Sequence, residues 1–96
     1  MHELMRRVVN AKFDAGAVLR GKNNPMWRVF NKATVSEDSS GRPVAFRFSL
    51  PDADQAIERP LDEQWLRSVS EKEMVDAMLG WLKEARGGSG AAGADD

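Results

Sequence analysis

Apolar side chains near the start of the chain recur with the period of an α-helix. They occupy positions i, i+1, i+4 and i+5, which lie along one side of a helix. These side chains are Leu4, Met5, Val8 and Val9. The sequence Asp14-Ala15-Gly16 then introduces residues that are typical of turns. The pattern therefore predicts a first helix over residues 3–12.

The segment from residue 17 to residue 35 shows features that are typical of β-strands. Ala17-Val18-Leu19 is a short β-type run, and the polar sequence at residues 21–25 predicts a turn, because Asn tolerates a left-handed backbone. Residues 26–35 then alternate between two faces. One face would carry Trp27, Val29, Asn31, Ala33 and Val35, and the other Arg28, Phe30, Lys32 and Thr34. We therefore expect residues 17–35 to be extended.

A second alternating segment follows a polar loop over residues 36–41, which ends in a glycine and fits a hairpin connection. In the return strand, one face would carry Val44, Phe46, Phe48 and Leu50, and the other Pro43, Ala45, Arg47 and Ser49. A further short strand is expected over residues 55–59. The pattern thus predicts a small antiparallel sheet of three to four strands.

The last part of the chain carries the clearest helical signal. Ser70 and Glu73 have the spacing of a capping box, in which each side chain accepts a hydrogen bond from the backbone amide of the other. An apolar stripe follows, formed by Met74, Val75, Met78, Leu79 and Leu82, with Trp81 on its flank. Residues 60–69 fit a strand or, as we favour, a short helical turn that carries Trp65 and Leu66 into the core. Residues 87–96, rich in Gly, Ala, Ser and Asp, predict a disordered tail.

These elements predict one α+β domain over residues 1–86, in which helices at both ends flank the antiparallel sheet. The order of the apolar segments over residues 13–69 resembles that of small SH3-like barrels. The segments that carry this resemblance are Phe13–Leu19, Trp27–Val29, Ala45–Phe48 and Trp65-Leu66. The resemblance implies a barrel and assigns no activity, because such folds host many functions.

Composition narrows the class of protein. The 96 residues contain no cysteine, which excludes disulfides, thiolate nucleophiles and cysteine-based zinc sites. No run of about 18 apolar residues could span a membrane, and the first residues lack the apolar core of a signal peptide. Small secreted domains usually need disulfides, so we expect an intracellular, cytoplasmic protein.

Residues suited to catalysis are scarce. The single histidine, His2, lies at the chain start, and there is no tyrosine. Acidic pairs such as Asp52 and Asp54 fall in expected turns, where they are common solvated residues. The glycine cluster that begins at Gly87 follows a helix, whereas phosphate-binding loops precede one. We therefore expect no enzymatic activity, no cofactor and no metal.

Charge is distributed unevenly. Residues 1–50 carry nine Lys/Arg against four Asp/Glu, a net charge of +5, and residues 51–96 carry five against eleven, a net charge of −6. The two halves either neutralise each other in space or present a basic face to a partner. The candidate binding residues are Arg20, Lys22, Arg28, Phe30, Lys32, Arg42, Arg47 and Trp81.

Two functions fit these observations. The first is a protein-binding module, such as an adaptor, an assembly subunit or a small inhibitor, with Trp81 as an interface anchor. The alternative is a nucleic-acid-binding protein in which Arg28, Phe30 and Lys32 form an exposed basic and aromatic face. A homodimer that buries one of the apolar helix stripes is a further hypothesis, because such a stripe is too wide for one small sheet to cover.

Overall fold

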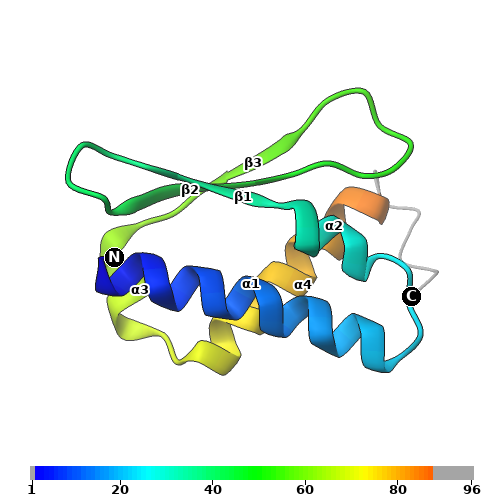
Figure 1. Cartoon of the computed structure of the whole chain (residues 1–96), viewed down its shortest axis with the longest axis horizontal. Coiled ribbons are helices and arrows are strands. Elements are labelled where there is room, and N and C mark those ends of the chain that lie inside the picture. The colour runs from blue at the N-terminus through cyan, green and yellow to red at the C-terminus, as the bar shows by residue number, and fades with distance from the viewer. Residues whose placement is uncertain (1, 88–96) are drawn as a thin grey trace.

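The computed structural model describes residues 2–87, which fold into a layer of helices and a three-stranded sheet (Figure 1). In chain order the elements are α1 (Glu3–Gly21), α2 (Trp27–Lys32), β1 (Thr34–Glu37), β2 (Pro43–Phe48), β3 (Ile57–Pro60), α3 (Glu63–Ser68) and α4 (Glu71–Gly87). The strands form an antiparallel sheet in the order β1-β2-β3. The predicted α+β class is confirmed, but the sheet is open and is not closed into the SH3-like barrel that the resemblance implied.

Helix α1 is longer than predicted and continues to Gly21, so Ala17-Val18-Leu19 is helical and not a strand. The buried stripe of α1 extends beyond Val8 through Ala11, Ala15 and Leu19. Gly16 lies inside the helix, where an added Cβ would be 3.6 Å from the backbone oxygen of Trp27. The predicted end at residue 12 is wrong, because a glycine inside a helix is tolerated where a second helix packs closely against it.

Helix α2 occupies most of the segment that was expected to be a strand over residues 26–35. Its buried side chains are Val29 and Phe30, and the C-cap residue Ala33, at spacing i+4 from Val29, is buried as well. The Asn24 side chain accepts a hydrogen bond from the Met26 amide at 2.9 Å, which helps the chain enter the helix. The turn before α2 is confirmed, since Asn23 has a left-handed φ of 59°.

The hairpin forms as predicted, and so does the central strand, except that Val44 and Ala45 lie on the opposite faces to those expected. In the turn between β1 and β2, the Asp38 carboxylate accepts hydrogen bonds from two backbone amides, and Gly41 has a φ of 84°. Phe46 and Phe48 of β2 are buried, as expected. Val44, expected on the same face, is 41% exposed instead. Strand β3 confirms the short third strand.

The C-terminal helix begins at the predicted capping box. The Glu73 amide donates to the Ser70 hydroxyl at 3.1 Å, and the Ser70 amide donates to the Glu73 carboxylate at 2.9 Å. The ambiguous segment before it forms α3, whose first turn is capped by the Asp62 side chain through the Trp65 amide at 2.9 Å. Leu66 of α3 is fully buried, so the favoured helical turn is confirmed.

The predicted tail is described only at Gly87, which ends α4. The rest of that segment, 88–96, lies outside the described residues. The tail and the domain boundary therefore stay predictions.

The core lies where the helices meet the inner face of the sheet (Figure 1). Its largest fully buried side chains are Phe30, Phe46, Leu4, Leu66, Met74, Met78 and Val8. The Phe30 ring centroid lies 6.0 Å from that of Phe46 and 6.3 Å from that of Phe48. Phe30 thus anchors the short helix α2 to β2, which turns the basic side chains of α2 outward.

Candidate functional site

Three of the basic residues selected from the sequence meet at one groove. Arg28 and Lys32 are four residues apart on α2, so they lie on the same side of that helix. Thr34 begins β1 just after α2 and is paired with Arg47 of β2. This register places Arg47 beside the C-terminal end of α2, although it lies far from α2 in the sequence.

The groove has a volume of about 630 Å³ and lies between α2 and the end of β2. Its apolar floor is formed by the buried Val29 and Phe48 and the half-buried Met26 and Leu50. The three cations lie exposed at its margin, and no lining residue carries a carboxylate. The four apolar residues together with Arg28, Lys32 and Arg47 are here named the basic groove.

The cations of the basic groove keep their charge unpaired. None of them takes part in the ion pairs found among residues 2–87. Glu58 of β3 lies opposite Arg47 in register, but the two form no ion pair. An adjoining hollow of about 470 Å³ shares Met26 and Leu50 with the groove and is lined by both a cation, Arg86 of α4, and a carboxylate, Asp52. The surface available to a partner is therefore longer than the groove alone.

Trp27, which the sequence interpretation did not select, lies between two of the arginines. The guanidinium carbon of Arg20 is 4.1 Å from a Trp27 ring centroid, and that of Arg28 is 5.3 Å away. Such cation–π contacts contribute about 0.5–1 kcal/mol each at exposed sites. The indole is thus already occupied by guanidinium groups and offers little open ring surface for stacking.

Phe30 does not belong to a binding surface, because its side chain is 0% exposed. The expected exposed face of Arg28, Phe30 and Lys32 required a strand, in which positions i, i+2 and i+4 point the same way. On a helix, position i+2 points elsewhere. Phe30 therefore turns into the core while the two cations face the groove.

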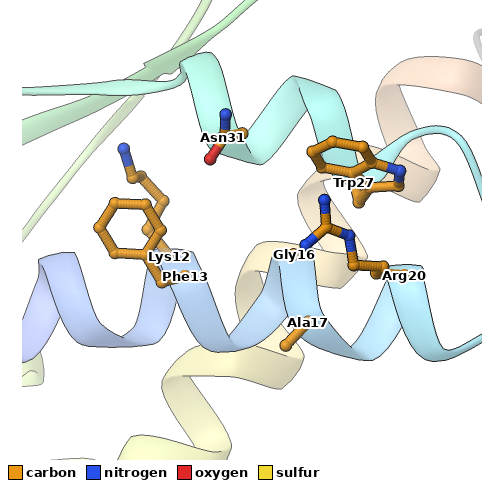
Figure 2. A pocket seen from close by; sticks show the side chains of 7 residues that line it. All are labelled: Lys12, Phe13, Gly16, Ala17, Arg20, Trp27 and Asn31. Carbon is orange, nitrogen blue, oxygen red and sulfur yellow. The ribbon is translucent and has the colours of Figure 1, made fainter.

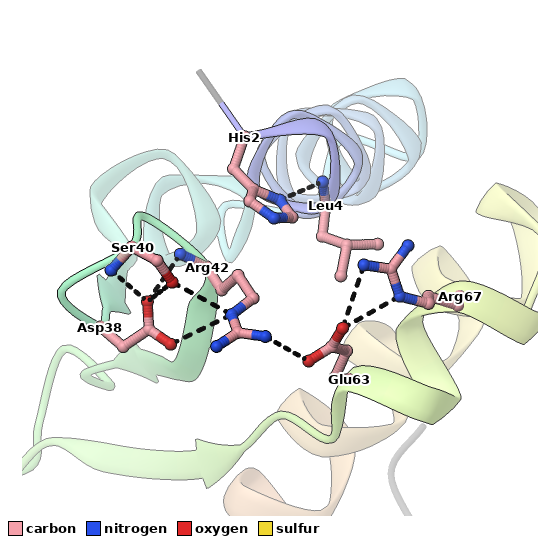
Figure 3. A network of polar contacts seen from close by, with 7 residues as sticks. All are labelled: His2, Leu4, Asp38, Ser40, Arg42, Glu63 and Arg67. Carbon is pink, nitrogen blue, oxygen red and sulfur yellow. Dashed lines mark hydrogen bonds and ion pairs between the residues drawn. The ribbon is translucent and has the colours of Figure 1, made fainter.

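Arg42 belongs to a structural network outside the groove (Figure 3). Its guanidinium donates to Glu63 at 3.0 Å and to Asp38 at 3.3 Å. Glu63 also accepts from Arg67 at 3.0 Å. The network connects the β1–β2 turn to the first turn of α3. Arg42 is therefore already paired with two carboxylates and stabilises the fold.

The remaining two candidates also lie away from the groove. Trp81 is half-buried on α4, with its ring centroid 5.8 Å from Phe46 and 6.2 Å from Trp65. The Arg59 guanidinium lies 5.4 Å from the Trp81 ring. Lys22 is exposed at the C-cap of α1. Neither Trp81 nor Lys22 lines the groove, so the structure does not bring all the selected residues together.

A second hollow lies on the other side of α2, against α1 (Figure 2). Its lining includes Lys12, a residue that the sequence interpretation passed over. Lys12 is only 9% exposed, and its ammonium donates to the backbone oxygen of Ala33 at 2.9 Å. Burial lowers the pKa of Lys12, because the ammonium loses hydration. The signal was present in the sequence: Lys12 is four residues after Val8, inside the apolar stripe.

The two oppositely charged halves of the chain are only weakly joined by ion pairs. Of the five ion pairs among residues 2–87, one connects the halves, from Arg42 to Glu63. Direct pairing therefore leaves the basic side of α2 without neutralisation.

The histidine and the carboxyl groups with a possible acid–base role lie apart from the basic groove and from the hollow of Lys12. The Nδ1 atom of His2 accepts a hydrogen bond from the Leu4 amide at 3.0 Å and so caps α1 (Figure 3). A hydrogen bond with Asp14 raises the pKa of Glu71, and both carboxyls are on the surface. Among the residues that the structure describes, no group of three or more His, Cys, Asp or Glu side chains could hold a metal ion.

Comparison of the chain with protein-family models, with curated proteins and with solved structures gives no match. Within residues 2–87, no helix combines the length and the apolar character needed to cross a membrane. The two hollows beside α2 are the candidate binding sites of the described residues.

Proposed function

We propose that this protein is a non-catalytic binding module whose basic groove holds an acidic and partly apolar segment of a partner protein. The observation that carries the proposal is the combination of an apolar floor with Arg28, Lys32 and Arg47 at the margin and no lining carboxylate. Apolar side chains of a segment would fill the floor, while its carboxylates would pair with the cations. Complementary charge would favour encounter and fix the register.

A protein partner is favoured over nucleic acid because of the aromatic residues. Single-stranded nucleic acids bind through cations together with open ring faces on which bases stack. Phe30, the aromatic residue expected for that role, is buried, and Trp27 carries guanidinium groups. The groove instead offers aliphatic and thioether surface at Val29 and Met26, which suits side chains better than phosphates.

The chemistry of the groove supports binding without catalysis. General acid–base and nucleophilic steps need a histidine, carboxylate, cysteine or activated hydroxyl beside the reacting group. The groove is lined by cations, apolar side chains, Thr34 and Ser49, and neither hydroxyl has a basic partner in a hydrogen bond among the described residues. These groups can orient a segment but cannot move a proton for it.

Selection from a random peptide library displayed on phage tests the proposal directly. The full chain is immobilised, and the enriched peptides are synthesised and titrated by fluorescence anisotropy. We expect enrichment of peptides that combine Asp or Glu with apolar residues. The double variant Arg28→Ala with Arg47→Ala should weaken their binding about 5- to 30-fold, since two exposed ion pairs at the edge of the groove contribute about 1–2 kcal/mol together.

The matched control is Arg6→Ala with Lys83→Ala, which removes two exposed cations from α1 and α4. This double variant should bind the peptides like the unchanged protein. Titrations with a random single strand and a random duplex, at about 50 and about 200 mM salt, test the alternative. If oligonucleotides bind tightly and in a salt-sensitive way, and the phage selection yields no acidic peptides, the function is nucleic-acid binding and not the one proposed. A selection without acidic–apolar enrichment would also overturn it.

A further inference from the structure

The hollow between α1 and α2 is a separate site from the basic groove (Figure 2). It has a volume of about 300 Å³, which lies at the lower end of the range of small-molecule pockets. The side chains that line it include Lys12, Phe13, Arg20, Trp27 and Asn31. Gly16 helps create the space, because it places no side chain between the two helices.

The buried ammonium of Lys12 is the first observation that points to a ligand. An ammonium has three N–H donors, and among the described residues Lys12 uses one, to the Ala33 oxygen at 2.9 Å. No ion pair within residues 2–87 includes Lys12. A cation that is 91% buried without an anion is costly, and an anionic ligand in the hollow would lower that cost.

The rest of the lining suits the same kind of ligand. Figure 2 shows Lys12 and Phe13 at one end of the hollow, Arg20 and Trp27 at the other, and Asn31 between them. Stacked on Trp27, the Arg20 guanidinium still has N–H donors along its edge, which can bind an oxyanion. Phe13 is 51% exposed, and the Lys12 ammonium lies 4.5 Å from the centroid of its apolar ring. No lining residue carries a carboxylate.

We infer that this hollow binds a phosphate monoester carried on a planar ring. Lys12 and Arg20, at opposite ends of the hollow, together carry the two positive charges that balance such a dianion, and the Asn31 amide between them adds a neutral donor. The Lys12 ammonium covers part of the Phe13 ring, and the rest of this half-exposed ring supplies the contact for the ring of the ligand. Phenyl phosphate, with about eleven non-hydrogen atoms, fits the volume and should bind with a dissociation constant in the millimolar range.

The probe is phenyl phosphate, titrated into the full ¹⁵N-labelled chain and followed by NMR. The protein has three Trp residues, so each indole N–H reports on a different place. The Trp27 signal should shift and saturate, whereas Trp65 and Trp81, which do not line the hollow, should stay in place. The second ionisation of a phosphate monoester lies near pH 6, so binding should weaken between about pH 7.5 and pH 5.

Variants of the two cations locate the site. Lys12→Met and Arg20→Ala should each weaken binding at least about tenfold, since each removes a charge-assisted hydrogen bond. Arg20 is exposed, so its variant stays informative if Lys12→Met fails to fold. Lys22→Ala is the matched control, because Lys22 is an exposed cation two residues from Arg20 that does not line the hollow.

The other ligands define what the site recognises. Inorganic phosphate and phenol should each bind more weakly than phenyl phosphate, and equal binding of inorganic phosphate would refute the role of the ring. A short peptide with phosphotyrosine carries the same group on a side chain. If the peptide binds more tightly than phenyl phosphate, the phosphorylated ring belongs to a partner protein. If phenyl phosphate binds more tightly, the natural ligand is a small molecule. The inference is overturned if phenyl phosphate shows no saturable shift at Trp27 or binds all three variants equally.

Discussion

Gly80 lies in the middle of α4, and its replacement by alanine should stabilise the protein. No atom lies within 4 Å of the Cβ that alanine would add, so the change introduces no steric conflict. Glycine inside a helix is about 0.8–1.0 kcal/mol less favourable than alanine, because the unfolded chain loses more freedom. We therefore expect the free energy of unfolding to rise by about 0.8–1 kcal/mol. In a domain of this size, that gain raises Tm by about 4–8 °C.

Replacement of Gly41 by alanine should instead lower the free energy of unfolding. Gly41 has a φ of 84°, and its nearest neighbour would be the His2 Cβ at 3.9 Å, so space is again sufficient. The cost comes from the backbone alone, since a residue with a Cβ pays about 1–2 kcal/mol in this region. Gly41→Ala therefore tests whether backbone conformation, and not crowding, decides the effect.

Urea unfolding followed by tryptophan fluorescence measures both variants against the unchanged protein. The midpoint should rise for Gly80→Ala and fall for Gly41→Ala, with equal m-values in all three proteins. A lower midpoint for Gly80→Ala would show that residue 80 is not in an open helical position. Changes of the same sign at both glycines would refute the explanation from backbone conformation.

Three further predictions concern the local structure and the core. Ser70→Ala removes half of the capping box and should lower the free energy of unfolding by about 1 kcal/mol in urea titrations, and an unchanged midpoint would contradict this role. Hydrogen bonds from the backbone amide of Arg42, and then from Ser40, lower the pKa of Asp38 to about 2, so its stabilisation is complete above the ordinary value near 4 and is lost as the pH falls toward 2. The stability deficit of Asp38→Asn should therefore shrink over that interval, and a deficit independent of pH would refute the assignment. Phe30→Ala should cost about 3–5 kcal/mol by urea unfolding, whereas Phe13→Ala at a half-exposed ring should cost far less; equal losses would contradict the burial of Phe30.

The elements that the sequence predicted well are those whose signals are local. The capping box at Ser70 and the apolar stripe behind it predicted α4, because a cap and a 3.6-residue period act within a few turns of one helix. The alternation around Phe46 predicted β2, and the polar loop ending at Gly41 predicted the hairpin. In each case the residues that determine the element are neighbours in the chain.

Part of the candidate site could also be anticipated. Arg28, Lys32 and Arg47 were selected as a charged set, and the structure gathers them at one groove. Arg28 and Lys32 were expected on a strand, and this expectation was wrong, since α2 is a helix. Lys12 and Trp27 were missed because their importance depends on how α1 and α2 pack together. A lysine within an apolar stripe signals burial only when the helix is known to continue past Gly16.

By itself, the sequence determined the α+β class, the hairpin, the C-terminal helix and the charge asymmetry, since all of these follow from local period, turn chemistry and composition. Only the tertiary structure decided the conformation of residues 17–35, whose apolar positions fit both a strand and a helix. Burial of Phe30 against β2 and the close approach of α2 to Gly16 favour the helix there. The same packing creates the basic groove on one side of α2 and the hollow of Lys12 on the other, because both are spaces between elements that are distant in the chain.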